Sequence, residues 1–470
     1  MRSRAAIVTV AGAIALRLAI GVGFVNYDTL YSLVWGQQLA RGQTPTYQLT
    51  LAPTPHPLLE LLGVILAPFG FAATLSVVVA LAYLSLAWLG YLAYRLGSEW
   101  FSRPAGLAAA ALILSRYEVL SYGVRSYADI PYVALVLAAL LLETRRRRAG
   151  RPVLAVLAVA GLLRPEAWLF AVLYWAWLWR GSTPRERAAL AALVAAAPVL
   201  WGLSDLLITG NALWSLTHTQ STAVELKRTT GLVNVPYTGA RRLGEVLAPD
   251  GLLAGGLGLV LALWLLRRRA ALGAIAGAIA VAALALVASS GLPIQDRYVF
   301  LIAALAAVFG GAGLFGWQTL ARDDPHRRLW QAAAALITVV IVVSSVAWQA
   351  PRFHKTFGST KPADKSLSAQ QQIASDLTAL VKNHHISTAC GPISLPYATA
   401  VPLLALELHT SPKNIVFQQP IQHGTFLRLA TAAKYTQYQL DPNEPHRTGS
   451  HPPTFRLVAR NRSWSAYATC

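Results

Sequence analysis

Long apolar runs alternate with short polar segments over residues 1–350, a pattern that predicts membrane-spanning helices. A spanning helix needs about 20 mostly apolar residues. Runs that reach or approach this length cover residues 5–24, 71–97, 104–121, 130–143, 188–208, 251–266, 270–290, 299–318 and 329–349. Residues 57–69 are short for a crossing, and we expect them to lie at the outer interface.

Residues 152–180 allow two interpretations, one long helix or a tight hairpin with Arg164-Pro165-Glu166 at its tip. One helix would place Arg151 and the later arginine cluster, which begins at Arg180, on opposite sides of the membrane. The positive-inside rule favours the hairpin, because both groups of arginines then stay in the cytoplasm. With the hairpin, the chain makes about 11 crossings.

Arginine clusters between the apolar runs indicate the orientation of the chain. The net charge is +20, and much of it lies in short loops such as Arg145 to Arg148 and Arg267 to Arg269. Such clusters mark cytoplasmic loops rather than a nucleic-acid surface. Arg2 and Arg4 then place the N-terminus in the cytoplasm and the C-terminus outside. With 55% hydrophobic residues, 13% charged residues and a mean hydropathy of +0.47, we expect a multi-pass plasma-membrane protein whose partners include membrane lipids but no nucleic acid.

The composition changes near residue 350, and residues 351–470 are polar and domain-sized. Residues 366–384 are predicted to form a helix capped by Ser366 or Ser368, and IVF and FRLVAR resemble short strands. We therefore expect a transmembrane domain over 1–350 and a small extracytoplasmic α/β domain over 351–470. The only two cysteines, Cys390 and Cys470, lie in this part, and a disulfide is plausible if it faces outside.

Ionisable residues at the outer ends of the predicted spans are the candidate chemistry. A carboxylate there is well placed to take the proton of an acceptor hydroxyl while that hydroxyl attacks the anomeric carbon of a sugar. An arginine at the membrane boundary can stabilise a phosphate leaving group by bidentate hydrogen bonds. The pattern thus indicates sugar transfer from a polyprenyl phosphate. The residues concerned are Asp28, Asp129, Arg164, Glu166, Arg297 and Tyr298.

The order of these motifs resembles the GT-C superfamily of integral-membrane glycosyltransferases, which includes protein O-mannosyltransferases and lipid A aminoarabinose transferases. The resemblance covers roughly residues 1–350. The matching segments are Asp28 followed by WGQQLARGQTPTY, His56-Pro57-Leu58-Leu59, Ser126-Tyr127-Ala128-Asp129, Gly161 to Glu166, and Asp296-Arg297-Tyr298. The first loop has one acid where some members have an Asp-Glu pair, and the late Arg-Tyr element lacks the following leucine-proline run.

The resemblance implies an inverting transfer from a polyprenyl-phosphate sugar to a hydroxyl of an envelope glycan, lipid or protein outside the cell. It implies that Asp28 is the catalytic base, with Asp129 in support, and that basic residues near the outer interface hold the donor phosphate. The candidate phosphate-binding residues are Arg164, Arg297, Tyr298, Lys227 and Arg228. The candidate donor- or acceptor-binding residues are Tyr27, His56 and Glu166. We expect no cofactor, and His384-His385 lack neighbours at metal-ligand spacing, so no metal is indicated.

Each candidate also has a structural interpretation that the sequence leaves open. Asp28 and Asp129 would serve equally as helix caps, Arg164 as the partner of Glu166 or of lipid headgroups, and Arg297 as the partner of Asp296. The alternative functions are a transporter or lipid flippase and a non-catalytic envelope scaffold. Acids at the outer edge, rather than at mid-membrane, argue against transport.

Overall fold

The computed structural model describes residues 2–358, 366–417, 421–444 and 453–470. The chain forms two compact units that do not follow the expected division at residue 350. Unit 1 comprises Met1–Gly21, Ala80–Ser204 and Arg228–Phe353, and unit 2 comprises Val22–Val79, Asp205–Lys227 and His354–Cys470. Residues 22–79 and 205–227 thus join the C-terminal residues in one unit.

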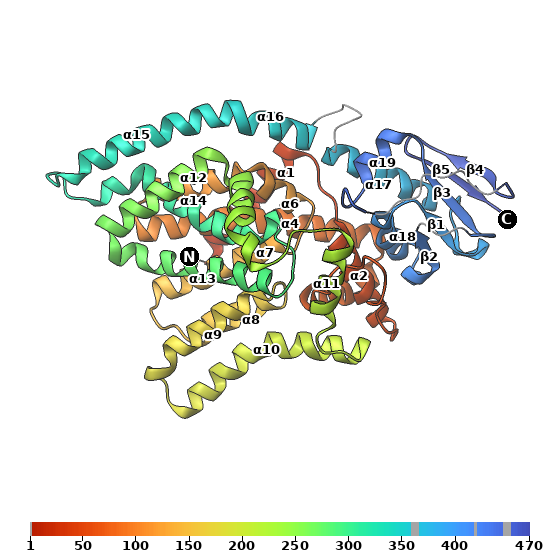
Figure 1. The fold of residues 1–470 in the computed structure, drawn as a ribbon, viewed down its shortest axis with the longest axis horizontal. Coiled ribbons are helices and arrows are strands. Elements are labelled where there is room, and N and C mark those ends of the chain that lie inside the picture. The colour runs from red at the N-terminus through yellow and green to blue at the C-terminus, as the bar shows by residue number, and fades with distance from the viewer. Residues whose placement is uncertain (1, 359–365, 418–420, 445–452) are drawn as a thin grey trace. The chain divides into compact units, whose positions relative to one another are not determined.

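Unit 1 is helical, and its helices pack closely through small residues. Its elements are α1 (Arg2–Ile20), α4 (Phe71–Trp100, which begins in unit 2), α5 (Arg103–Leu114), α6 (Tyr117–Val124), α7 (Asp129–Arg145), α8 (Arg151–Gly161), α9 (Glu166–Leu178), α10 (Pro184–Thr209, which ends in unit 2), α12 (Ala240–Leu265), α13 (Arg267–Ser289), α14 (Phe300–Phe315) and α15 (His326–Ser344). α14 packs against α12 and α5 (Figure 1). A Cβ added at Gly258 would lie 1.9 Å from the Phe309 carbonyl oxygen, so this close approach requires glycine.

The number of membrane spans is lower than predicted. Among the described residues, six helices are long and apolar enough to cross a membrane, or seven if the bent pair α5 and α6 counts as one span. The expected span at 130–143 is α7, which has only 17 residues. The expected 104–121 span is broken, with a bend of 66° between α5 and α6. The chain is nevertheless a polytopic helical membrane protein with a small sheet-containing part, as predicted.

Residues 151–178 form a helical hairpin, which resolves the choice between one helix and two. The backbone N–H of Gly150, before α8, donates to the Tyr174 hydroxyl near the end of α9 at 3.0 Å. Arg148 Nη2 donates to the Leu178 carbonyl at 3.2 Å. The two helices have 11 and 13 residues. They are therefore about 16 and 20 Å long, too short to cross a hydrocarbon layer of about 30 Å.

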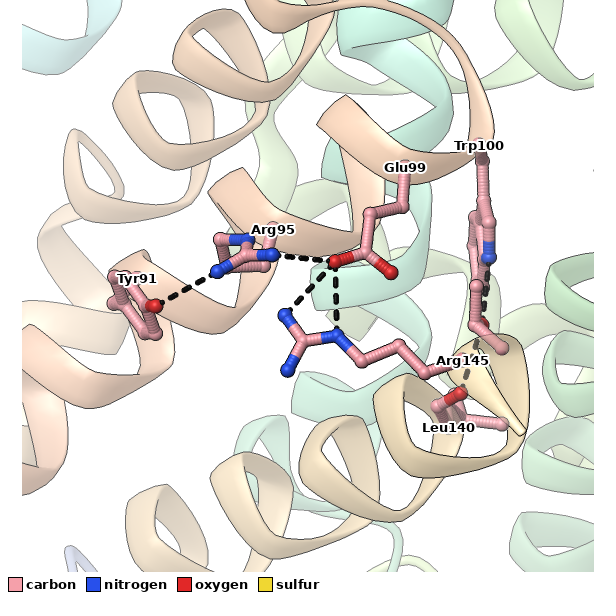
Figure 2. A network of polar contacts seen from close by, with 7 residues as sticks. Tyr91, Arg95, Glu99, Trp100, Leu140 and Arg145 are labelled. Atoms are coloured by element: carbon pink, nitrogen blue, oxygen red, sulfur yellow. Dashed lines mark hydrogen bonds and ion pairs between the residues drawn. The ribbon is translucent and has the colours of Figure 1, made fainter. Parts of the chain in front are cut away.

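An ion-pair network joins the last turn of α4 to the last turn of α7 (Figure 2). Glu99 Oε1 accepts from Arg95 Nη2 at 2.6 Å and from Arg145 Nη2 at 2.8 Å. Trp100 Nε1 donates to Thr144 Oγ1 at 2.9 Å. This end of unit 1 carries the arginine-rich 145–148 segment. Asp129 begins α7 and therefore lies at the other end of the same helix.

The described residues of unit 2 form a five-stranded mixed sheet of order β2-β1-β3-β5-β4 (Figure 1). Its strands are β1 (Ile393–Leu395), β2 (Ile415–Phe417), β3 (Thr425–Leu429), β4 (Arg456–Arg460) and β5 (Trp464–Ala468). β1 pairs in parallel with β2 and β3, and β5 pairs antiparallel with β3 and β4. The predicted strands at IVF and FRLVAR are confirmed. So is the predicted helix, α17 (Leu367–Lys382), where Ser366 Oγ accepts from the Ala369 N–H at 3.3 Å.

The first loop packs into the same core as this sheet. It forms α2 (Tyr27–Ala40) and α3 (Pro57–Leu66), and residues 205–227 add α11 (Trp214–Glu225). Trp35 of α2, Leu404 of α18 (Val401–Glu407) and Trp464 of β5 belong to one buried apolar cluster. Cys390 and Cys470 are joined by a disulfide with a Cα–Cα distance of 5.8 Å. The C-terminal α/β part and the first loop are thus built as one body.

Candidate active site

Three predicted site residues from separate elements of unit 1 meet in one cluster. Asp129 is the first residue of α7, Arg164 lies in the α8–α9 turn, and Glu166 is the first residue of α9. Arg164 Nη1 donates to Asp129 Oδ1, and Arg164 Nε lies 3.2 Å from both carboxylate oxygens of Glu166. The three side chains are 2–8% exposed. With two acids and one arginine, this cluster carries one net negative charge.

A ladder of alternating arginine and tyrosine side chains extends from this cluster. The Arg164 guanidinium lies 4.2 Å from the centre of the Tyr298 ring. The Arg297 guanidinium lies 5.7 Å from the centre of the Tyr298 ring and 5.5 Å from the centre of the Tyr127 ring. The Arg125 guanidinium also contacts the Tyr127 ring, at 5.0 Å from its centre. Stacking on aromatic rings orients each guanidinium. We call Arg164, Tyr298, Arg297, Tyr127, Arg125 and Tyr122 the arginine–tyrosine ladder.

The sequence analysis missed Arg125, although the segment SYGVRSYAD places it between two tyrosines. The loop that carries it is tightly formed, since the next residue, Ser126, has a φ of 61°. Non-glycine residues in this left-handed region are uncommon and concentrate at functional sites. An arginine flanked by tyrosines just before a helix-starting aspartate is the signal that would have found it.

Asp296 pairs with Arg242 of α12. Its Oδ1 lies 3.2 Å from Arg242 Nη1, and Arg242 also donates to Glu245 Oε2 at 2.8 Å. Arg297 Nε donates to the Gln295 side-chain oxygen at 2.9 Å. The Arg242–Asp296 pair thus attaches the loop that carries Arg297 and Tyr298 to the first part of α12.

Asp28 and Asp129 do not occupy the cap positions of their helices. In unit 2, the cap of α2 is Asn26, whose Oδ1 accepts from the N–H groups of Asp28 at 2.8 Å and Thr29 at 3.1 Å. Asp28 therefore lies half-buried in the first turn, where the helix dipole favours its charge. In unit 1, Ala128 occupies the cap position of α7.

The remaining predicted residues have varied surroundings. Tyr27 is buried, and its hydroxyl donates to the Leu51 carbonyl at 3.0 Å. His56 is buried at the cap position of α3. Lys227 is exposed after α11, and the next residue, Arg228, is half-buried in unit 1. No group of three or more His, Cys, Asp or Glu side chains that could hold a metal occurs among the described residues.

Buried ionisable residues that the sequence analysis did not single out include Glu60 and the pair of Arg116 and Asp250. Glu60 of α3 accepts from the Tyr47 hydroxyl at 2.7 Å, and burial raises the pKa of its carboxyl to about 8 despite that hydrogen bond. Arg116, between α5 and α6, lies 2.9 Å from Asp250 of α12, and these side chains are 2% and 0% exposed. A lone acid within the apolar run PLLELLGVILAPF was a visible signal for Glu60.

Comparison with known proteins shows a shared fold without sequence similarity. No protein-family model matches the chain, and no curated protein sequence matches it. The structure is similar to that of ArnT from Cupriavidus metallidurans bound to undecaprenyl phosphate, with a TM-score of 0.57 and 13% identity over 99% of this chain and 98% of ArnT. Apo ArnT gives a TM-score of 0.52 and 15% identity over the same shares. The chain therefore has the fold of ArnT.

Proposed function

We propose that this protein is an integral-membrane glycosyltransferase that moves a sugar from a polyprenyl-phosphate donor to a hydroxyl of an envelope glycan, lipid or protein. The observation that carries the proposal is the ArnT fold over 99% of the chain, since the ArnT structure holds undecaprenyl phosphate. The clustering of Asp129, Arg164 and Glu166 at one end of a helical unit supports it, because buried ionisable groups in membrane proteins mark functional sites.

The orientation follows from the two ends of α7. One end carries the arginine-rich 145–148 segment and the Glu99 network, which the positive-inside rule assigns to the cytoplasm. Asp129 and the arginine–tyrosine ladder lie at the other end. The transfer is therefore proposed to occur on the extracytoplasmic side, with the N-terminus in the cytoplasm and the C-terminal domain outside.

The structure refines the proposed role of each residue. Arg164 is engaged by Asp129 and Glu166, so we assign it to holding those two carboxylates rather than the donor phosphate. Arg297 and Tyr298 remain the proposed phosphate-binding residues, with Lys227 and Arg228 as further basic residues. Stacking on tyrosine rings orients the Arg297 guanidinium, whose planar fork of N–H donors suits a phosphate group.

Asp28 remains the proposed catalytic base of an inverting transfer. In the proposed step, the acceptor hydroxyl oxygen forms a bond to the anomeric carbon while the bond from that carbon to the phosphate oxygen breaks. The hydroxyl proton goes to Asp28, and the electron pair leaves with the lipid phosphate. Tyr27 lies beside Asp28 in α2, but its buried hydroxyl is committed to Leu51, which favours a structural role for it.

Sugar transfer in proteoliposomes tests the proposal. Labelled polyprenyl-phosphate sugars and crude envelope acceptors would be offered to the wild type, to Asp28→Asn and to Asp323→Asn, an exposed control. We expect transfer by the wild type and the control, and a loss of about a hundredfold or more in Asp28→Asn. Equal transfer by all three would remove Asp28 from the mechanism, and transfer by none would count against the enzyme.

A lipid flippase is the second candidate, and three features of unit 1 favour it. The broken pair α5 and α6, the kinked α12 and the buried Arg116–Asp250 pair are features found at transporter binding sites. Movement of a fluorescent lipid phosphate between leaflets, without covalent transfer of sugar, would favour this function. Covalent transfer without such movement would exclude it.

A further inference from the structure

Helix α12 is sharply broken near its middle. Ala248 has a φ of 56° and a ψ of 173°, and Pro249 follows it. Proline removes one backbone donor, and the non-helical residue frees neighbouring carbonyls from the helical ladder. In a membrane, such freed carbonyls must find partners from other elements. The Leu247 carbonyl, at this break, accepts a hydrogen bond from Arg116 Nη1.

Arg116 itself lies at a second break, where α5 ends and α6 begins at an angle of 66°. Its Nε donates to the Leu112 carbonyl at 2.9 Å, and its Nη1 donates to Asp250 Oδ1 at 3.0 Å. Asp250 Oδ1 also accepts from Ser344 Oγ of α15 at 2.7 Å. One fully buried guanidinium thus connects carbonyls from two broken helices and a carboxylate tied to a third helix.

Both breaks lead directly to the candidate site. After the break between α5 and α6, the chain runs through α6 into the loop of Arg125 and Tyr127 and then to Asp129. Before its break, α12 carries Arg242, whose pairing with Asp296 attaches the loop of Arg297 and Tyr298. The directions of α6 and of the first part of α12 therefore decide where the two sides of the arginine–tyrosine ladder meet.

We propose that Arg116 and Asp250 are positioning residues for the transfer reaction, a role that rests on the proposed function. The plainer alternative is that the pair only stabilises the fold. Physical chemistry separates the two, because replacing both members of a buried ion pair with apolar residues is often neutral for stability, whereas removing one is not. If the pair only stabilises the fold, a folded double variant should keep its activity. If the pair positions the site, activity should fall even in a folded double variant, because the directional hydrogen bonds from Arg116 to the Leu247 and Leu112 carbonyls are lost.

The test compares the full-length double variant Arg116→Met/Asp250→Leu with the wild type in proteoliposomes and in detergent. A cysteine at buried Ser121 of α6 reports the placement of that helix. It would be the only thiol, because the two native cysteines form a disulfide. The matched control is Arg95→Met/Glu99→Leu, which removes a partly exposed ion pair at the arginine-rich end (Figure 2).

We expect the double variant to fold, to lose on the order of a hundredfold in kcat, and to change KM for the donor by less than about threefold. Thiol labelling at position 121 should become faster in that background and stay slow in the control. A double variant that keeps the wild-type kcat and in which the thiol at position 121 is still labelled slowly would overturn the proposal. If the double variant fails to fold, Arg116→Lys decides, since it keeps the charge but loses the planar fork. Wild-type kcat in Arg116→Lys would overturn the proposal.

The thiol measurement also separates this proposal from the proposed function. A wild type without transfer activity on any donor would refute the glycosyltransferase. Labelling at position 121 would still show whether the Arg116–Asp250 pair holds α6, so an unchanged labelling rate in the double variant refutes the positioning role alone.

Discussion

Substituting Arg164 should destabilise unit 1 more than any exposed ion-pair variant. Arg164→Met removes the cation shared by Asp129 and Glu166, whose side chains are 2% and 8% exposed. Removing one member of a buried ion pair costs about 3–5 kcal/mol, because the other charge is left buried without compensation. Here two carboxylates lose their partner, and the contact with the Tyr298 ring adds roughly 0.5–2 kcal/mol. We therefore expect the upper end of the range, about 5 kcal/mol.

The free energy of unfolding would be measured in mixed micelles by titration with a denaturing detergent. The matched control is Arg241→Met, which removes a guanidinium that is 61% exposed and paired with Glu245. That change should cost less than about 1 kcal/mol, as exposed pairs do. Combining Arg164→Met with Asp129→Asn and Glu166→Gln should recover most of the lost stability, because no unpaired charge remains.

A loss of less than about 1 kcal/mol for Arg164→Met would refute the reasoning, because it would equate this cluster with an exposed pair. A full-size loss without recovery in the triple variant would show that packing of the Arg164 side chain, and not charge, is responsible. Either result would also withdraw the argument that Arg164 is too engaged to bind the donor phosphate.

Three further predictions concern other parts of the chain. The raised pKa of Glu60 means that the folded state holds its proton more tightly than the unfolded state, so the stability it confers is full below about pH 4.5 and is lost as the pH rises through about 8. The thermal midpoint of the wild type should therefore decrease as the pH is raised from about 5 to about 8.5, and that of Glu60→Gln should decrease less. Cys390→Ser/Cys470→Ser should lower the stability of unit 2 by about 2–5 kcal/mol, seen as faster proteolysis of residues 367–470, and an unchanged rate would contradict it. Arg297→Gln should raise KM for the donor at least tenfold, roughly the effect of losing 1.4 kcal/mol of a charge-assisted contact, with equal KM values in the two proteins refuting its phosphate role.

The sequence predicted the features that depend on local order along the chain. The hairpin tip at Arg164 and the start of α7 at Asp129 follow from arginine clusters and apolar runs, and the structure brings both into contact. The helix after Ser366 follows from its cap and its apolar spacing. In each case the sequence pattern that predicts the feature lies within about one helix of it. Apolar periodicity and the positions of charged residues were therefore enough to predict it.

The count of spans failed for a physical reason. Apolar composition predicts that a segment avoids water, but not that it crosses the membrane as a single straight helix. α8 and α9 are apolar yet too short, and the run 104–121 bends at Arg116, where an arginine within the apolar pattern marks the break. That arginine was a local signal of a buried partner, since an unpaired charge at this depth would be costly.

The local sequence around Arg116 does not identify Asp250 as its partner. For the same reason, the local sequence did not predict how the chain divides into two units. Arg116 and Asp250 are 134 residues apart, and only the packing of α12 against the α5–α6 break brings them together. Likewise, Trp35 and Trp464 belong to one buried cluster, although the composition suggested a boundary near residue 350. Since α2, which carries Asp28, shares its core with the C-terminal sheet, the proposed base is held by a domain that composition alone would have described as an appendage. A polar tail in a polytopic chain should therefore be examined for packing against early loops before any catalytic role is assigned to the membrane domain alone.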